Sequence, residues 1–205
     1  MRPVWYVLLA AVLAGILFSC GCTSQPTSST QAGAATTSVI SAVETSPDML
    51  PVIALHLSDF PEGFELIYAG DTEPPAESTL LADPAYRGGY SLTVSNESSD
   101  FPTGELVDQI VLLYSRPVTR ERLAEVFTEN YPELSTWPLT TLEDPGIGDA
   151  SIAYHFTYPD TTLSGYTIAF GRKDVYQILT TMTGDGTADY DFLKGIAEKA
   201  LAKIP

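Results

Sequence analysis

Cysteine and histidine are both scarce in this sequence. The two cysteines, Cys20 and Cys22, lie together near the N-terminus, so the rest of the chain can form neither a disulfide nor a cysteine-based zinc site. The two histidines, His56 and His155, are far apart, and neither has a Glu-x-x-His pattern beside it. A Gly-x-Ser-x-Gly motif is also missing. These absences argue against a zinc enzyme and against a serine hydrolase with a nucleophile elbow.

Basic residues are the second scarcity. The chain has 10 Lys and Arg residues against 26 Asp and Glu residues, which gives a formal net charge of -16. Such a field repels phosphate backbones, so we expect no nucleic acid partner. The glycine-rich stretch from Gly146 to Ser151 has the look of a phosphate loop, but it precedes an expected strand and has acidic neighbours. We interpret it as a turn, and we expect no cofactor.

One long apolar run marks the N-terminus. Arg2 precedes an uninterrupted apolar stretch from Val4 to Phe18, and small residues follow it from Ser19 to Thr23. This order predicts a secretory signal in residues 1–22. The stretch is shorter than the roughly 20 residues of a spanning helix, but continued through Cys22 it reaches about nineteen, so an uncleaved membrane anchor is the alternative.

The end of this run resembles a lipobox, in which a small residue precedes a cysteine that receives a diacylglyceryl group. Cys22, which follows Gly21, is the better candidate for lipidation, and Cys20, which follows Ser19, is the alternative. Two acyl chains hold a protein firmly because each buried CH₂ contributes about 0.8 kcal/mol. We therefore expect the chain to lie on the outer face of the cell membrane, held there by a lipid or by an anchor helix.

Composition divides the remainder of the chain in two. Residues 23–49 are rich in Ser and Thr and almost uncharged, which is typical of a disordered tether that buries too little apolar surface to fold. Residues 50–205 are predicted to form a single globular domain, which we expect to be monomeric. Asn96 stands in an Asn-Glu-Ser sequence and is a candidate N-glycosylation site, consistent with export.

Apolar alternation predicts several strands in the domain. Residues 106–114 are apolar on both parities, which indicates a central strand covered on both sides. Residues 175–183 follow a turn and should fold back on residues 164–170 as a hairpin. Period-two patterns predict strands with one exposed face at residues 90–95, 152–158 and 166–170.

Two amphipathic helices are predicted beside these strands. One follows Pro117, has Thr119 as its N-cap and ends before Pro132. The other is C-terminal, begins at Asp189 and Asp191, and carries an apolar stripe made of Leu193, Ile196, Ala197, Ala200, Leu201 and Ile204. A weaker helix is predicted between residues 77 and 86. The fold class is therefore α+β, a largely antiparallel sheet with amphipathic helices packed on it.

Four segments carry a resemblance to known proteins. They are residues 57–64, residues 87–90, residues 146–151 and the turn at residues 170–175, followed by the final helix. Their order resembles a group of archaeal surface lipoproteins, and it also resembles the PsbP/Mog1-like sandwich fold. The resemblance covers most of residues 55–205 and consists of turns and packing positions. It therefore implies a fold and a location but no chemistry.

Two sets of side chains are candidates for binding. Acidic residues after the last predicted strand are weak candidates for Ca²⁺, although their spacing is not that of an EF-hand and helix capping accounts for them: Asp185, Asp189 and Asp191. Tyrosines on the predicted strands could line an aromatic groove or fill the core: Tyr90, Tyr154, Tyr158, Tyr166 and Tyr176.

These features favour a membrane-anchored extracytoplasmic lipoprotein whose domain is a non-enzymatic binding or envelope-associated module. Its partner would be a protein or a small molecule. The alternative is an extracellular hydrolase that uses paired carboxylates, because some of the 26 acidic residues will approach one another in any fold. A solvent-facing pair of carboxylates in one pocket would favour the hydrolase.

Overall fold

An antiparallel sheet is the centre of the fold. The computed structural model describes residues 45–73, 83–96, 104–132 and 136–205, which belong to one compact unit. The strands are β1 (Glu65–Asp71), β2 (Tyr86–Ser95), β3 (Glu105–Tyr114), β4 (Leu139–Thr141), β5 (Ala150–Thr157), β6 (Ser164–Arg172) and β7 (Val175–Thr183). The helices are α2 (Leu50–Ile53), α4 (Arg120–Asn130) and α5 (Tyr190–Ala202), with 3-10 turns η2 (Pro47–Met49) and η3 (Leu57–Asp59).

The sheet topology confirms the predicted α+β class. The seven strands lie in the order β1-β2-β3-β7-β6-β5-β4, and each neighbouring pair is antiparallel. All five strands expected from the sequence form, and β6 and β7 make the expected hairpin, with Lys173 in its turn at a φ of 55°. β3 is covered on both sides as predicted, since its adjacent residues Val111 and Leu112 are both fully buried.

The prediction of an exposed face is wrong for β6 and for the first half of β5, where residues 151–153 are all buried. Ile168, Ala169 and Phe170 are consecutive, and all three are fully buried, so both faces of the strand are covered. Ile168 and Phe170 belong to the core beneath α5, whereas Ala169 belongs to the core beneath α4. The hydroxyls of Thr167 and Thr180, also buried, hydrogen-bond to each other across β6 and β7 at 3.0 Å. These two threonines are thus buried with their hydroxyl groups hydrogen-bonded.

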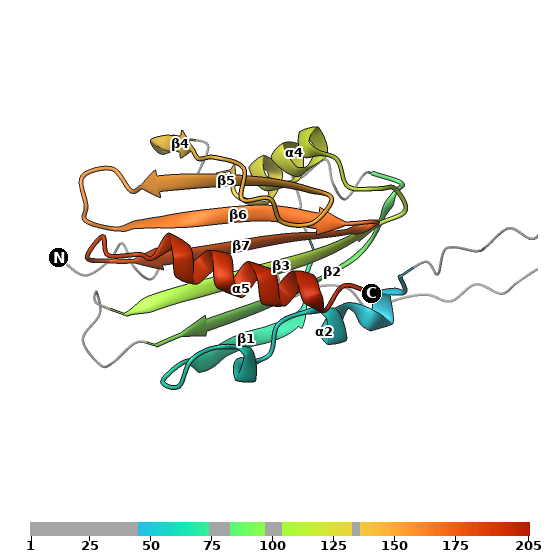
Figure 1. The fold of residues 1–205 in the computed structure, drawn as a ribbon, viewed down its shortest axis with the longest axis horizontal. Helices are drawn as coiled ribbons and strands as arrows, with labels where there is room; N and C mark the ends of the chain where they lie inside the picture. The colour runs from blue at the N-terminus through green and yellow to red at the C-terminus, as the bar shows by residue number, and fades with distance from the viewer. Residues whose placement is uncertain (1–44, 74–82, 97–103, 133–135) are drawn as a thin grey trace, which may run out of the picture. The chain divides into compact units, whose positions relative to one another are not determined.

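Helix α5 covers one face of the sheet and runs across the front of it in Figure 1. The helix begins at Tyr190 because the Asp189 carboxylate caps it, accepting the backbone N–H groups of Asp191 and Phe192 at 2.8 and 3.2 Å. Most of the predicted apolar stripe is buried against the sheet, namely Leu193, Ile196, Ala197 and Ala200. This confirms that the C-terminal helix is amphipathic and docked.

Helix α4 covers part of the opposite face. Its predicted N-cap is confirmed, because the Thr119 hydroxyl accepts the Arg122 N–H at 3.2 Å. Leu123, Val126 and Phe127 of the helix are buried. They pack in a second core cluster that includes Leu112 of β3, Ile178 of β7 and Ile152 of β5. The two long helices therefore lie on different faces of the sheet.

A third cluster closes one end of the α5 face. Leu50 and Ile53 of α2 pack there with Leu113 and with Ile204, which lies just after α5. The C-terminus accordingly ends close to α2 in Figure 1. The chain that leaves α2 is tied to the sheet, because the Leu55 N–H donates to Gln109 Oε1 at 2.8 Å. Gln109 Nε2 in turn donates to Gln177 Oε1 at 2.7 Å, inside the core.

Two boundaries differ from the sequence prediction. Residues 45–49, assigned to the tether, pack on the domain: the Thr45 hydroxyl donates to Asp174 Oδ1 at 3.0 Å, and Thr45 is 5% exposed. The weak helix at 77–86 falls mostly outside the described residues, but its last residue, Tyr86, starts β2 and is not helical. Local composition does not indicate either boundary, because both depend on contacts with strands that are distant in the sequence.

Replacing Leu193 by Ala should lower the free energy of unfolding by about 2–5 kcal/mol. The side chain is fully buried between α5 and the sheet, so the substitution would leave a cavity there. The measurement is urea denaturation followed by circular dichroism. Glu198→Ala on the exposed face of the same helix is the control and should stay within about 0.5 kcal/mol of the wild type. Equal stability of both variants would mean that α5 is not docked.

Replacing Thr45 by Ala should cost about 1 kcal/mol, because Asp174 loses a hydrogen bond from a buried hydroxyl. The neighbouring Ser46→Ala is a matched control, since the Ser46 side chain makes no capping bond to η2. Thermal denaturation of the two full-length variants provides the comparison. Identical melting curves for the two variants would mean that the domain starts at residue 50, as the sequence predicts.

Candidate functional site

A cleft lies on the α5 face of the sheet, beside the first turn of the helix. Its volume is about 540 Å³. Residues 142–145 form one wall and Lys194 of α5 lies on the other, and the neighbouring rings of Tyr166 of β6 and Tyr190 of α5 form an aromatic floor between them. The volume is in the range of small-molecule sites, about 300–1,000 Å³.

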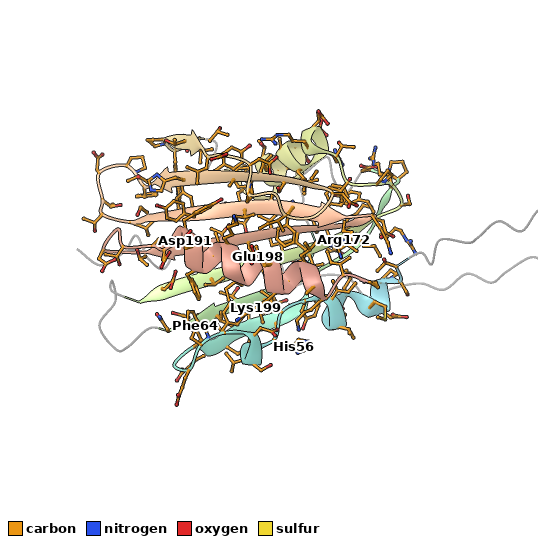
Figure 2. All side chains as sticks on the ribbon, viewed as in Figure 1. His56, Phe64, Arg172, Asp191, Glu198 and Lys199 are labelled. Carbon is orange, nitrogen blue, oxygen red and sulfur yellow. The ribbon has the colours of Figure 1, made fainter. Side chains whose placement is uncertain are left out.

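The two sides of α5 have different neighbours among the described residues. On the β1 side, Phe64 stacks on Phe192 with ring centroids 5.9 Å apart. Farther along that side, Lys199 Nζ donates to the Asp59 carbonyl at 2.7 Å. Figure 2 shows Phe64 and Lys199 along this seam, with Asp191 marking the first turn of the helix. The opposite side of the first turn faces residues 142–145 across the cleft.

Three rings form a continuous aromatic series from the sheet to the helix. His155 of β5 and Tyr166 of β6 are direct partners in the strand register, and their ring centroids are 4.9 Å apart. The Tyr166 ring also lies 5.4 Å from the Tyr190 ring, at an interplanar angle of 56°. Direct cross-strand partners point to the same face, which explains why His155 and Tyr166 both lie on the α5 side. All three side chains are partly exposed.

The loop wall is fixed by Asp144. Its Oδ1 accepts the Ser151 hydroxyl at 2.5 Å and the Gly146 N–H at 3.0 Å, and its Oδ2 accepts Arg120 Nη1 at 2.5 Å. The bonds from Ser151 and Gly146, followed by the Arg120 contact, hold the pKa of the Asp144 carboxyl below its usual value. Asp144 is therefore an ionised carboxylate with both oxygens engaged in holding the loop.

The glycine-rich stretch is a turn that leads into β5, as the sequence indicated. Gly146 and Gly148 have φ angles of +69° and +74°, a region that disfavours other residues. A Cβ on Gly148 would also come within 2.2 Å of the Gly171 carbonyl oxygen. These glycines therefore allow the loop to pass close to β6. The stretch leads into a strand, so it does not begin a helix whose N-terminus could hold a phosphate.

Negative charge dominates at Tyr190. Burial, and then the carboxylates of Asp191, Asp144 and Glu143, raise the pKa of its hydroxyl. Glu143 and Asp144 are themselves part of the cleft wall. Lys194 is the one basic side chain among the described residues that line the cleft.

The structure does not bring the five predicted tyrosines onto one surface. Tyr166 is the one that lines the cleft. Tyr176 is fully buried, and its hydroxyl donates to the Pro117 carbonyl at 2.9 Å. Tyr154 lies on the α4 face, where it stacks on Phe127 with ring centroids 4.8 Å apart.

The other two tyrosines lie apart from the cleft as well. Tyr90 packs against the cluster beneath α2. Tyr158 follows β5 and makes an edge contact with Trp137, with ring centroids 4.8 Å apart. Strand tyrosines in this protein therefore mostly fill the core, and Tyr190, which joins Tyr166 in the cleft, comes from a helix.

The weak Ca²⁺ candidates act as local caps. Asp185 Oδ1 accepts the N–H and the hydroxyl of Thr187 at 3.1 and 2.6 Å, and Asp189 caps α5. Asp191 lies exposed in the first turn of that helix. Within the described part of the chain, no group of three His, Cys, Asp or Glu side chains is arranged to hold a metal ion.

Asn96 lies exposed at the end of β2. Its side-chain oxygen accepts the Glu105 N–H at 2.6 Å. This bond leaves the amide nitrogen, the atom that carries the sugar in an N-glycan, outside the contact. Glycosylation at Asn96 stays a prediction.

Among the described residues, two carboxyl groups have raised pKa values, and they lie on opposite faces of the sheet. Burial raises the pKa of the Glu105 carboxyl, and the negative charge of Asp189 raises this pKa further. The hydrogen bond that Glu105 accepts from the Thr181 hydroxyl acts in the opposite direction. Burial also raises the pKa of Asp108, against hydrogen bonds from Tyr131 and Thr93 at 2.7 and 2.8 Å. Neither group lines the cleft.

Cys20 and Cys22 lie outside the described residues. In the segments that the structure does describe, no helix combines the length and the apolar character needed to cross a bilayer.

Comparisons with known proteins add two distant structural neighbours. The extracellular domain of PknH from Mycobacterium tuberculosis is 11% identical, with a TM-score of 0.49 over 77% of this chain and 97% of that one. A putative uncharacterized protein from Mycobacterium smegmatis, the Rv0999 ortholog, is 14% identical, with a TM-score of 0.45 over 76% of this chain and 96% of that one. No family model and no curated protein matches. The archaeal group and the PsbP/Mog1-like fold named from the sequence gain no support from these matches and stay predictions.

Replacing Asp144 by Asn should destabilise the protein at pH 7 and much less at pH 3. The wild-type carboxylate has a lowered pKa, so its stabilising effect is present above the unfolded value, about 4, and is lost as the pH falls through the folded value. Urea denaturation of both proteins at the two pH values gives the difference. A difference that is independent of pH would show that the Asp144 charge does not hold the loop.

Proposed function

We propose that this protein is an extracytoplasmic binding module, held on the outer face of a membrane by its N-terminus, whose domain takes a small ligand in the α5 cleft. The observation that carries the binding role is the aromatic floor made by Tyr166 and Tyr190 between two charged walls. Concave sites with aromatic surfaces and a few polar groups are typical of ligand binding. The sequence of residues 1–44 supports the location, because a secretory signal precedes a Ser/Thr-rich tether.

The finer assignments belong to this proposal. Cys22 is the lipidated residue, with Cys20 as the alternative, and Asn96 carries a glycan where the cell supplies one. The domain folds as a PsbP/Mog1-like sandwich and works as a monomer. Its high negative charge keeps it away from nucleic acid and from anionic lipid headgroups.

Binding is favoured over hydrolysis by the state of the carboxylates. A glycoside hydrolase with paired carboxylates needs one that stays protonated and one that is ionised on either side of a substrate. Two exposed carboxylates, Glu143 and Asp144, do line the cleft, but they are adjacent on one wall and do not lie on either side of it. Asp144 is also ionised and has both oxygens engaged in loop contacts. The carboxyls with raised pKa values, Glu105 and Asp108, lie away from the cleft and on opposite faces. The geometry therefore supports a cleft that holds a ligand.

Binding itself is tested by a thermal-shift screen of the full-length protein in detergent against amines, carboxylates, sugars and phosphate esters. At least one class should raise the melting temperature of the wild type and not of Tyr190→Ala, since binding to the native state alone stabilises it. A screen without any such class would contradict the binding role.

Replacing Cys22 by Ser should remove the lipid from the mature N-terminus. Intact mass measurement of the protein from membranes should give a wild-type chain that begins at a diacylglyceryl-modified Cys22. Cys20→Ser is the matched control and should leave that mass change in place. Loss of the lipid only in Cys20→Ser would move the site to Cys20, and an unmodified protein found whole inside cells would overturn the proposed location.

A further inference from the structure

The charged side chains that line the cleft differ in whether they already have a partner. Asp144 forms an ion pair with Arg120 and accepts the Ser151 hydroxyl, so both of its oxygens hold the loop. Glu143, its neighbour, is exposed on the same wall, and no hydrogen bond or ion pair joins it to another described residue. Lys194, on the α5 wall, likewise forms no ion pair within the described segments. The cleft therefore contains one available carboxylate, one available ammonium group and an aromatic floor.

The local field favours positive charge over the aromatic floor. After burial, the carboxylates of Asp191, Asp144 and Glu143 raise the pKa of the Tyr190 hydroxyl. Aromatic rings attract cations placed over their faces within about 6 Å of the centroid. The Tyr166 and Tyr190 rings are tilted against each other at 56° and do not form a flat stack, and both side chains are partly exposed at the cleft.

We propose that the cleft binds a small organic cation, with an ammonium or guanidinium head that lies against the Tyr166 and Tyr190 rings and pairs with Glu143. This inference rests on the proposed binding role of the cleft and names the class of ligand. The volume of about 540 Å³ suits a free small molecule. Lys194 carries the same sign as the ligand and repels its head toward Glu143.

The first test uses two probes of the same shape. Choline and its neutral isostere 3,3-dimethylbutan-1-ol differ in the charge of the head group. Isothermal titration of the full-length protein in detergent should show choline binding at least about tenfold more tightly than the alcohol. The preference should shrink as salt is raised, because an exposed charge pair is screened. Equal affinity for the two probes would overturn the inference.

Three variants then separate the contributions of the rings and the charges. Tyr190→Phe keeps the ring and should bind choline within about twofold of the wild type, whereas Tyr190→Ala should lose about three- to tenfold. Glu143→Gln removes the charge at constant shape and should also lose about three- to tenfold. Melting curves of each free variant check that the fold is intact. Should Tyr190→Ala prove unstable, Glu143→Gln is sufficient, because Glu143 is exposed.

The sign of the Lys194→Gln effect is decisive. For a cationic ligand, removal of the ammonium should strengthen choline binding by about two- to fivefold. Two results would mean that the site takes anions. One is weaker choline binding by Lys194→Gln. The other is a wild type that binds acetate and not choline, together with a Lys194→Gln variant that no longer binds acetate.

Failure of this inference can be told apart from failure of the binding role. If carboxylates or sugars bind in a way that depends on Tyr190 and choline does not, the cleft is a ligand site for another class, and only the cation assignment is wrong. If none of the screened classes binds, the proposed binding role fails as well. Binding to phosphatidylcholine vesicles without binding to free choline would also contradict a small-molecule site.

Discussion

The docking of α5 on the sheet is the interaction on which the rest of this structure depends. Its buried stripe fills the core between β3, β7 and β6, and its first turn supplies one wall of the cleft. The helix begins where it does because Asp189 caps it, so the cap also sets the position of Tyr190 over Tyr166. The same burial that stabilises the domain therefore places the aromatic floor.

Sequence reasoning found the elements that local patterns determine. The alternation in residues 90–95 and 152–158 identified strands, and the stripe from Leu193 to Ala200 identified α5, because each pattern records which side of one element meets an apolar neighbour. It failed at β6, where small and hydroxyl residues resembled an exposed face. They are buried because Thr167 and Thr180 satisfy each other and Ala169 fits beneath α4. Such pairing depends on register between strands, which a single strand does not reveal.

The candidate site could be predicted only in part. Tyr166 was among the five tyrosines singled out, but which face each tyrosine occupies depends on which helix covers that face. The cleft joins residues 142–145, Tyr166 and Tyr190, which are distant in sequence and meet only through the strand order β7-β6-β5 and the path of α5. The role of Asp144 as a loop anchor likewise depends on Arg120 and Ser151 from other elements. A single sequence contains no local signal for contacts between residues that are so far apart in the chain.

Nuclear magnetic resonance of the uniformly ¹⁵N-labelled protein tests the central claim most directly, by following backbone amide shifts during a choline titration. A cation site at the start of α5 should give saturable shifts concentrated in residues 142–144 and 146, in His155 and Tyr166, and in the first turn of α5, with the α4 face unaffected. Shifts spread over the whole domain, confined to the α4 face, or absent at saturating choline would contradict a cation site at the start of α5.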